Sequence, residues 1–83
     1  MANYVELVEF IAKSLVTKPE AVVVEATKDE DTGFVRVLIS ADSEDTGRII
    51  GKKGATINSI RHVAKAASIK SGERIDVDVK ETL

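Results

Sequence analysis

The 83-residue chain contains no cysteine and no tryptophan, and only one proline and one histidine, His62. Without cysteine it can form no disulfide, no thiolate metal site and no cysteine nucleophile, and it suits a reducing compartment. The remaining residues show no nucleophile–base pair and no cluster of metal ligands, and His62 has the pattern of a partly exposed helix residue. We therefore predict a protein that is not an enzyme and needs no metal or cofactor.

Long apolar runs are also missing. No apolar segment approaches the roughly 20 residues needed to cross a bilayer. The first residues lack the basic stretch and apolar run of a secretory signal. The length predicts a single domain over residues 1–83. The expected location is the cytoplasm, with no membrane partner.

Acidic and basic residues are unevenly distributed along the chain. The formal net charge is −2, yet residues 48–74 carry seven basic side chains against one acidic, whereas residues 1–47 carry four basic against ten acidic. A basic segment on an acidic body indicates a directed anion-binding face. The alternative, a solvated helix face, predicts the same charge pattern.

The first half of the chain predicts one helix and two strands. Apolar residues recur at helical spacing over residues 5–16, until Pro19 ends the pattern. The valine-rich residues 21–27 and residues 34–41 are typical of strands, and the polar run 28–33 between them is typical of a hairpin connection. We expect these strands to form an antiparallel pair.

A short helix is predicted next, ending at Ile50. Asp42 or Ser43 is its predicted N-terminal cap. Glu44 and Asp45 are then expected in the first turn, where the positive end of the helix dipole favours acidic side chains.

A longer helix and a strand complete the predicted elements. Residues 75–79 alternate between apolar and polar, as in a half-buried strand, with Asp76 and Asp78 toward water. A helical crossover makes the last two strands parallel neighbours. The order α-β-β-α-α-β predicts a two-layer α+β fold, a three-stranded mixed sheet with helices on one face. The longer helix leaves Ser68 on or beside its wet face, and its apolar stripe consists of Ile57, Ile60, Val63, Ala64 and Ala67.

Two glycines enclose two lysines between the predicted helices. Gly51 can leave the preceding helix in a left-handed conformation, and Gly54, without a side chain, lets a ligand backbone approach the turn. Lys52 and Lys53 then project from the tip, beside the free N–H groups and positive dipole end of the next helix. The pattern predicts a turn that holds a phosphate backbone. The alternative is an ordinary helix-to-helix turn that needs flexible residues.

This turn and its flanks resemble the prokaryotic (type II) KH domain, in particular the small bacterial stand-alone KH proteins of the KhpA type. A GxxG loop alone would be weak support, but isoleucines lie on both sides of it and the element order agrees. The resemblance spans essentially the whole chain. It is carried by residues 45–54, 56–57, 59–61, 64–67 and 75–79.

The resemblance implies a cytoplasmic protein that holds about four unpaired nucleotides of single-stranded RNA between the glycine turn and the edge of the sheet. It also implies a homodimer, a heterodimer with a larger KH-containing RNA-binding protein, or both. A post-transcriptional regulator or RNA chaperone linked to cell shape is the role it suggests. The residues expected to bind RNA are Arg48, Ile50, Gly51, Lys52, Lys53, Gly54, Ile57 and Arg61.

Several of these assignments leave an alternative open. Arg48 and Arg61 either extend the phosphate path or are solvated helix residues, paired with Glu44 or another acid. Ile50 and Ile57 either line the cleft or pack in the core. The rival function is a KH-fold dimerisation or protein-interaction module with little RNA affinity of its own.

Overall fold

The first helix forms where the apolar spacing predicts it. In the computed structural model, which describes residues 4–80, α1 spans Tyr4–Leu15 and buries Val8 and Ala12. The Tyr4 hydroxyl donates a hydrogen bond to Glu73 Oε1 at 2.7 Å, which ties the start of α1 to the segment before the last strand. Burial, together with this hydrogen bond, raises the pKa of Tyr4 to about 12. A 3₁₀ turn, η1 (Pro19–Ala21), follows α1.

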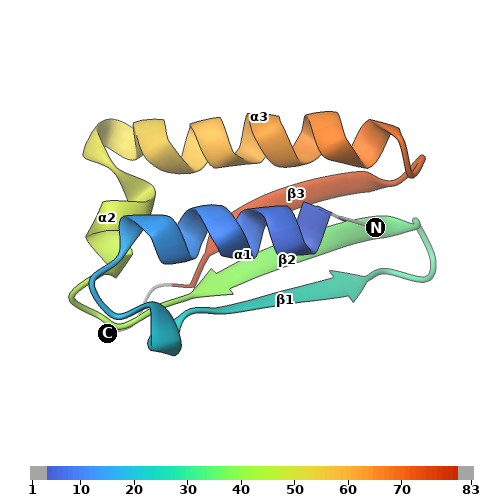
Figure 1. Ribbon diagram of the computed structural model, residues 1–83. Helices are drawn as coiled ribbons and strands as arrows, with labels where there is room; N and C mark the ends of the chain where they lie inside the picture. The colour runs from blue at the N-terminus through green and yellow to red at the C-terminus, as the bar shows by residue number, and fades with distance from the viewer. Residues whose placement is uncertain (1–3, 81–83) are drawn as a thin grey trace.

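Three strands form one sheet, in the order β1-β2-β3 (Figure 1). β1 (Val23–Lys28) pairs antiparallel with β2 (Phe34–Ser40), and β2 pairs parallel with β3 (Arg74–Val79). The hairpin between β1 and β2 is closed by a bond from the Asp29 N–H to the Phe34 carbonyl, at 2.8 Å. The predicted element order and the three-stranded mixed sheet are confirmed.

The connection from β2 to β3 consists of α2 (Thr46–Ile50), a 3₁₀ turn η2 (Lys52–Gly54) and α3 (Ala55–Ile69). Figure 1 shows α1 and α3 side by side over one face of the sheet, which leaves the other face open. Alternation along β2 and β3 sends every second side chain into the core between the two layers. The sheet residues buried there are Val35, Val37, Ile39, Ile75, Val77 and Val79.

The apolar stripe of α3 differs from its predicted form at two positions. Val63 is 44% exposed, whereas Ser68, predicted on or beside the wet face, is only 3% exposed. The buried arc runs instead through Ile57, Ile60 and Ala64 to Ser68, because α3 packs against both β3 and α1. The Ser68 hydroxyl is buried at little cost, since it donates to the Lys65 carbonyl at 2.8 Å.

No helix among residues 4–80 is both long enough and apolar enough to span a membrane. Within the same residues, no group of three or more histidine, cysteine or acidic side chains is arranged to hold a metal ion.

Candidate nucleic-acid interface

The turn between α2 and α3 has an unusual backbone. Gly51 has φ 77° and ψ 173°, and Gly54 has φ 76° and ψ 13°. Between them Lys53 also has positive φ, at 57°, and it is the only described residue other than glycine that does. A left-handed conformation costs an ordinary residue roughly 1–2 kcal/mol. Lys53, one of the two lysines of the turn, therefore carries backbone strain.

The two glycines are required for different reasons. A Cβ on Gly51 would lie 2.8 Å from the backbone nitrogen of Thr56 and would overlap the Thr56 side chain. A Cβ on Gly54 would meet nothing closer than Ile57 Cγ2, at 3.9 Å. Gly51 therefore allows the turn to close onto the first residues of α3, whereas Gly54 supplies only its conformation.

Positive charge gathers at the tip of this turn. Lys52 and Lys53 are both exposed, and neither side chain has a hydrogen-bond or ion-pair partner among residues 4–80. Gly54 is the N-cap of α3, and no described side chain caps that helix end. The first N–H groups of α3 and the positive end of its dipole thus add to the two lysine charges.

Asp45 anchors the turn to the end of α1 from a buried position, with 1% of its surface exposed. Its carboxylate accepts hydrogen bonds from the Thr17 N–H (3.1 Å), the Thr17 hydroxyl (2.9 Å) and the Lys18 N–H (3.0 Å). Burial acts to raise the pKa of Asp45, but these hydrogen bonds and the nearby Arg48 outweigh it, so the pKa lies below its usual value. The carboxylate stays charged and holds α2 in place.

The structure corrects the prediction for the start of the short helix, whose N-cap is Asp45 and not Asp42 or Ser43. α2 begins at Thr46, so Glu44 and Asp45 precede it and do not occupy its first turn. Asp42 Oδ1 accepts the Glu44 N–H at 2.9 Å and forms a turn before the helix. Sequence reasoning missed the role of Asp45, because its partners lie 27 and 28 positions earlier and no local pattern marks them.

The two predicted arginines have different surroundings. Arg48 has a side chain that is 59% exposed, and its Nε lies 3.6 Å from Asp45 Oδ1. Arg61 lies on α3 and is held in place: its guanidinium donates to the Val77 carbonyl at 2.8 and 3.1 Å and lies 3.3 Å from Asp76 Oδ1. Arg48 is therefore available at the surface, whereas Arg61 joins α3 to the free edge of β3.

The free edge of β3 is partly covered by side chains. β3 pairs only with β2, and its Val77 carbonyl is occupied by Arg61. The Val79 N–H donates to the side chain of Asp78 at 2.9 Å. These contacts satisfy outward-facing backbone groups that would otherwise be open to a partner strand.

The two predicted isoleucines also differ in how deeply they are buried. Ile57 is buried in the core, and Ile50 is half-buried and packs against it. Ile50 thus presents more surface near the turn than Ile57 does. The structure brings Arg48, Ile50 and the residues 51–54 together at one end of the molecule, and whether they contact RNA stays a prediction.

Comparison with known proteins identifies the family. The family described as "KhpA/KhpB, KH domain" matches residues 5–79. The chain belongs to this KH-domain family. The predicted resemblance to KhpA-type proteins is therefore confirmed.

Relatives in the KhpA/KhpB family match along nearly their whole length. RNA-binding protein KhpA of Clostridium perfringens is 45% identical over 74 residues, which cover 89% of this chain and 96% of that protein. KhpA of Listeria monocytogenes is 36% identical and KhpA of Borreliella burgdorferi 32% identical, over 92% and 93% of this chain and 97% and 92% of theirs. Membership of this family of named RNA-binding proteins agrees with the prediction that the chain is not an enzyme.

Solved structures share the KH fold. Aquifex aeolicus Era aligns with a TM-score of 0.65 and 21% identity, over 92% of this chain but only 29% of Era. A second Era structure, in complex with nucleotides 1506–1542 of 16S ribosomal RNA, aligns with the same TM-score and 22% identity, over 28% of that chain. This likeness supports the fold assignment of the KhpA/KhpB family member described above.

Proposed function

We propose that this chain binds single-stranded RNA, which it holds by the phosphate backbone at the turn formed by residues 51–54. The observation that carries the proposal is the pair of exposed lysines at the N-terminus of α3, which have no partner and no capping side chain beside them within residues 4–80. Backbone N–H groups, the helix dipole and two ammonium groups all favour an anion at the same place. Arg48 and Ile50 lie beside the turn and extend the proposed surface.

The comparisons support RNA as the ligand. The KhpA relatives are named RNA-binding proteins, and one Era structure contains a fragment of ribosomal RNA. A GxxG loop that clamps about four nucleotides is the general mode of KH recognition. In this proposal Lys52 and Lys53 contact phosphates, Gly51 and Gly54 allow close approach, and Ile50 lies nearest the bases, whereas Ile57 packs in the core.

A clamp of this size implies help from a second RNA-binding unit. Few phosphate contacts give limited affinity, and linking two binding units raises it without new contacts. The proposal therefore includes action in the cytoplasm as a homodimer or with a larger KH-containing protein, as a post-transcriptional regulator or RNA chaperone. Under this proposal Arg61 acts mainly by fixing α3 to β3, since its guanidinium is already engaged.

Fluorescence anisotropy with a five-nucleotide oligouridine tests the clamp. We expect saturable binding that weakens with salt and is lost in the double variant Lys52→Asp, Lys53→Asp. Aspartate tolerates positive φ better than most residues, so the variant should keep the thermal stability of the parent. The matched control, Lys28→Asp with Lys70→Asp, makes the same charge change at exposed positions outside the turn and should retain binding. Equal binding by both double variants would contradict the proposal.

A protein-interaction module is the second candidate, favoured by exposed apolar side chains on the helix layer. Phe10 on α1 is 71% exposed and Ile69 on α3 is 77% exposed. This alternative predicts complex formation that survives loss of both turn lysines and is lost in Phe10→Ser. Sedimentation analysis of the two variants separates the candidates.

A further inference from the structure

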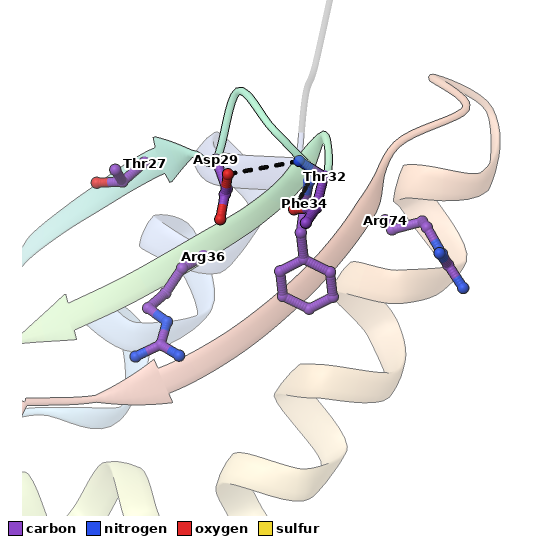
Figure 2. A pocket seen from close by; sticks show the side chains of 6 residues that line it. All are labelled: Thr27, Asp29, Thr32, Phe34, Arg36 and Arg74. Atoms are coloured by element: carbon purple, nitrogen blue, oxygen red, sulfur yellow. Dashed lines mark hydrogen bonds between the residues drawn. The ribbon is translucent and has the colours of Figure 1, made fainter.

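A second basic cluster lies on the open face of the sheet. Phe34, Arg36 and Arg74, hereafter the sheet-face patch, line a depression of about 860 Å³ next to the β1–β2 hairpin. Figure 2 shows the ring of Phe34 between the two arginines. Because Val35 and Val37 point into the core, the alternating Phe34 and Arg36 project from the opposite side of β2. The parallel register places Arg74 of β3 directly beside Phe34.

Two acidic neighbours of the sheet-face patch, Asp29 and Asp76, make their contacts with other groups. Asp29 Oδ1 accepts the N–H groups of residues 31 and 32, at 2.9 and 3.4 Å, and is engaged in the hairpin turn. Asp76, the register partner of Arg36, pairs with Arg61 instead. Within residues 4–80 the guanidinium groups of Arg36 and Arg74 have no hydrogen-bond or ion-pair partner. Phe34 lies between them with 38% of its surface exposed.

The patch continues around the edge of β3 to the C-terminal half of α3. A second depression, of about 320 Å³, is lined by Lys65 and Ile69 of α3 and shares Phe34 and Arg74 with the first. The turn lies at the other end of α3, whose 15 residues span about 22 Å at ~1.5 Å per residue. A nucleic-acid strand that runs from the turn along α3 therefore passes Lys65, then the second depression and then the patch.

We propose that the sheet-face patch is a second contact for the same RNA strand, used by nucleotides beyond those held at the turn. Aromatic rings stack on nucleotide bases of any sequence, and arginine binds phosphate through two parallel hydrogen bonds. A base stacks on Phe34, and the flanking phosphates lie on Arg36 and Arg74. This inference rests on the proposed function, because it extends the path of an RNA that the turn holds.

The dependence of binding on RNA length tests the inference. A four-nucleotide clamp has about six times more registers on a 15-nucleotide oligouridine than on a 5-nucleotide one, so the clamp alone predicts about sixfold tighter binding of the longer strand. With the patch we expect roughly a further tenfold gain. The variant Arg36→Gln, Arg74→Gln should bind the short strand as the parent does and retain only the sixfold gain. Phe34→Leu should lose part of the additional gain.

The control removes equal charge near the same end of the molecule without touching the depression. Lys28→Gln with Lys70→Gln should keep the full length dependence, and thermal unfolding of each variant verifies its fold. An unchanged length dependence in Arg36→Gln, Arg74→Gln would overturn the inference and leave the patch for a protein partner. An equal loss in the lysine control would also overturn it, because general electrostatics would then suffice. If the parent binds neither strand, the proposed function itself has failed.

Discussion

The α2–α3 turn and the β1–β2 hairpin lie toward opposite ends of α3 (Figure 1), and the basic surfaces beside them are built in different ways. At the turn, Lys52 and Lys53 are adjacent in the chain and are displayed by a backbone with positive φ at three of the residues 51–54. In the sheet-face patch, Arg36 and Arg74 are far apart in the chain and come together through the pairing of β2 with β3. The backbone of the turn therefore depends on particular residues at particular positions, whereas the patch is assembled by strand pairing between residues distant in the chain.

Substitution of Gly51 should have the largest effect on stability. In Gly51→Ala the new Cβ would overlap Thr56, at a position whose φ and ψ favour glycine strongly. We expect a loss of at least about 3 kcal/mol in the free energy of unfolding, measured by chemical denaturation. Gly54→Ala should cost about 1 kcal/mol, for its positive φ alone. Gly47→Ala, where a Cβ meets nothing within 4 Å, should be neutral or stabilising. Equal costs at 51 and 54 would remove the distinction between the two glycines.

Replacement of Asp45 should have an intermediate effect, visible in the pH dependence. Its folded-state pKa is lowered, so the charged carboxylate contributes stability above the ordinary value of 3.8, and this contribution is lost as pH falls below that value. Asp45→Asn should lower the unfolding temperature at pH 7 and flatten the loss of stability as the pH falls below about 4. Thermal unfolding followed by circular dichroism over this range checks both effects. The control Asp31→Asn, in the exposed hairpin turn, should change neither. Parallel pH profiles for Asp45→Asn and the parent would show that Asp45 does not anchor the turn.

Substitution of Lys53 should have the smallest effect on stability and the opposite sign. Lys53→Gly relieves the positive φ and should stabilise the fold by up to about 1 kcal/mol, although glycine also increases the entropy of the unfolded chain. The same variant should bind RNA more weakly. The slope of log Kd against the logarithm of salt concentration should fall by about 0.7, as expected for one lost phosphate contact. Lys70→Gly, after the end of α3, is the control and should leave the salt dependence unchanged. A stabilised variant with unchanged RNA affinity would mean that Lys53 is strained without contributing to binding.

Much of the fold could be predicted because its signals are local. The apolar spacing of α1, the alternation of β3 and the glycine–lysine motif each occupy a short stretch of chain, and each predicted its element to within a few residues. The buried face of α3 was predicted only in part. Val63 is exposed and Ser68 is buried, the reverse of the prediction, because the packing of α1 and β3 together determines which side of the helix is covered.

The candidate site, like the fold, could be predicted only in part from the sequence. The turn and its two lysines follow from sequence, since Gly51 and Gly54 are the residues that tolerate positive φ and Lys52 and Lys53 cannot be buried between them without a partner. The contacts of Arg61 with Val77 and Asp76 could not be predicted from sequence, because they form only when α3 has docked against β3.

Residues close together in the chain are enough to indicate the family, the order of the elements and the glycine–lysine turn. Which charges remain available depends on how the elements pack. Packing buried Asp45 under Thr17 and Lys18, attached Arg61 to the edge of β3, and brought Arg36 and Arg74 to either side of Phe34. Contacts of that kind join residues distant in the chain, and their formation depends on the docking of whole elements.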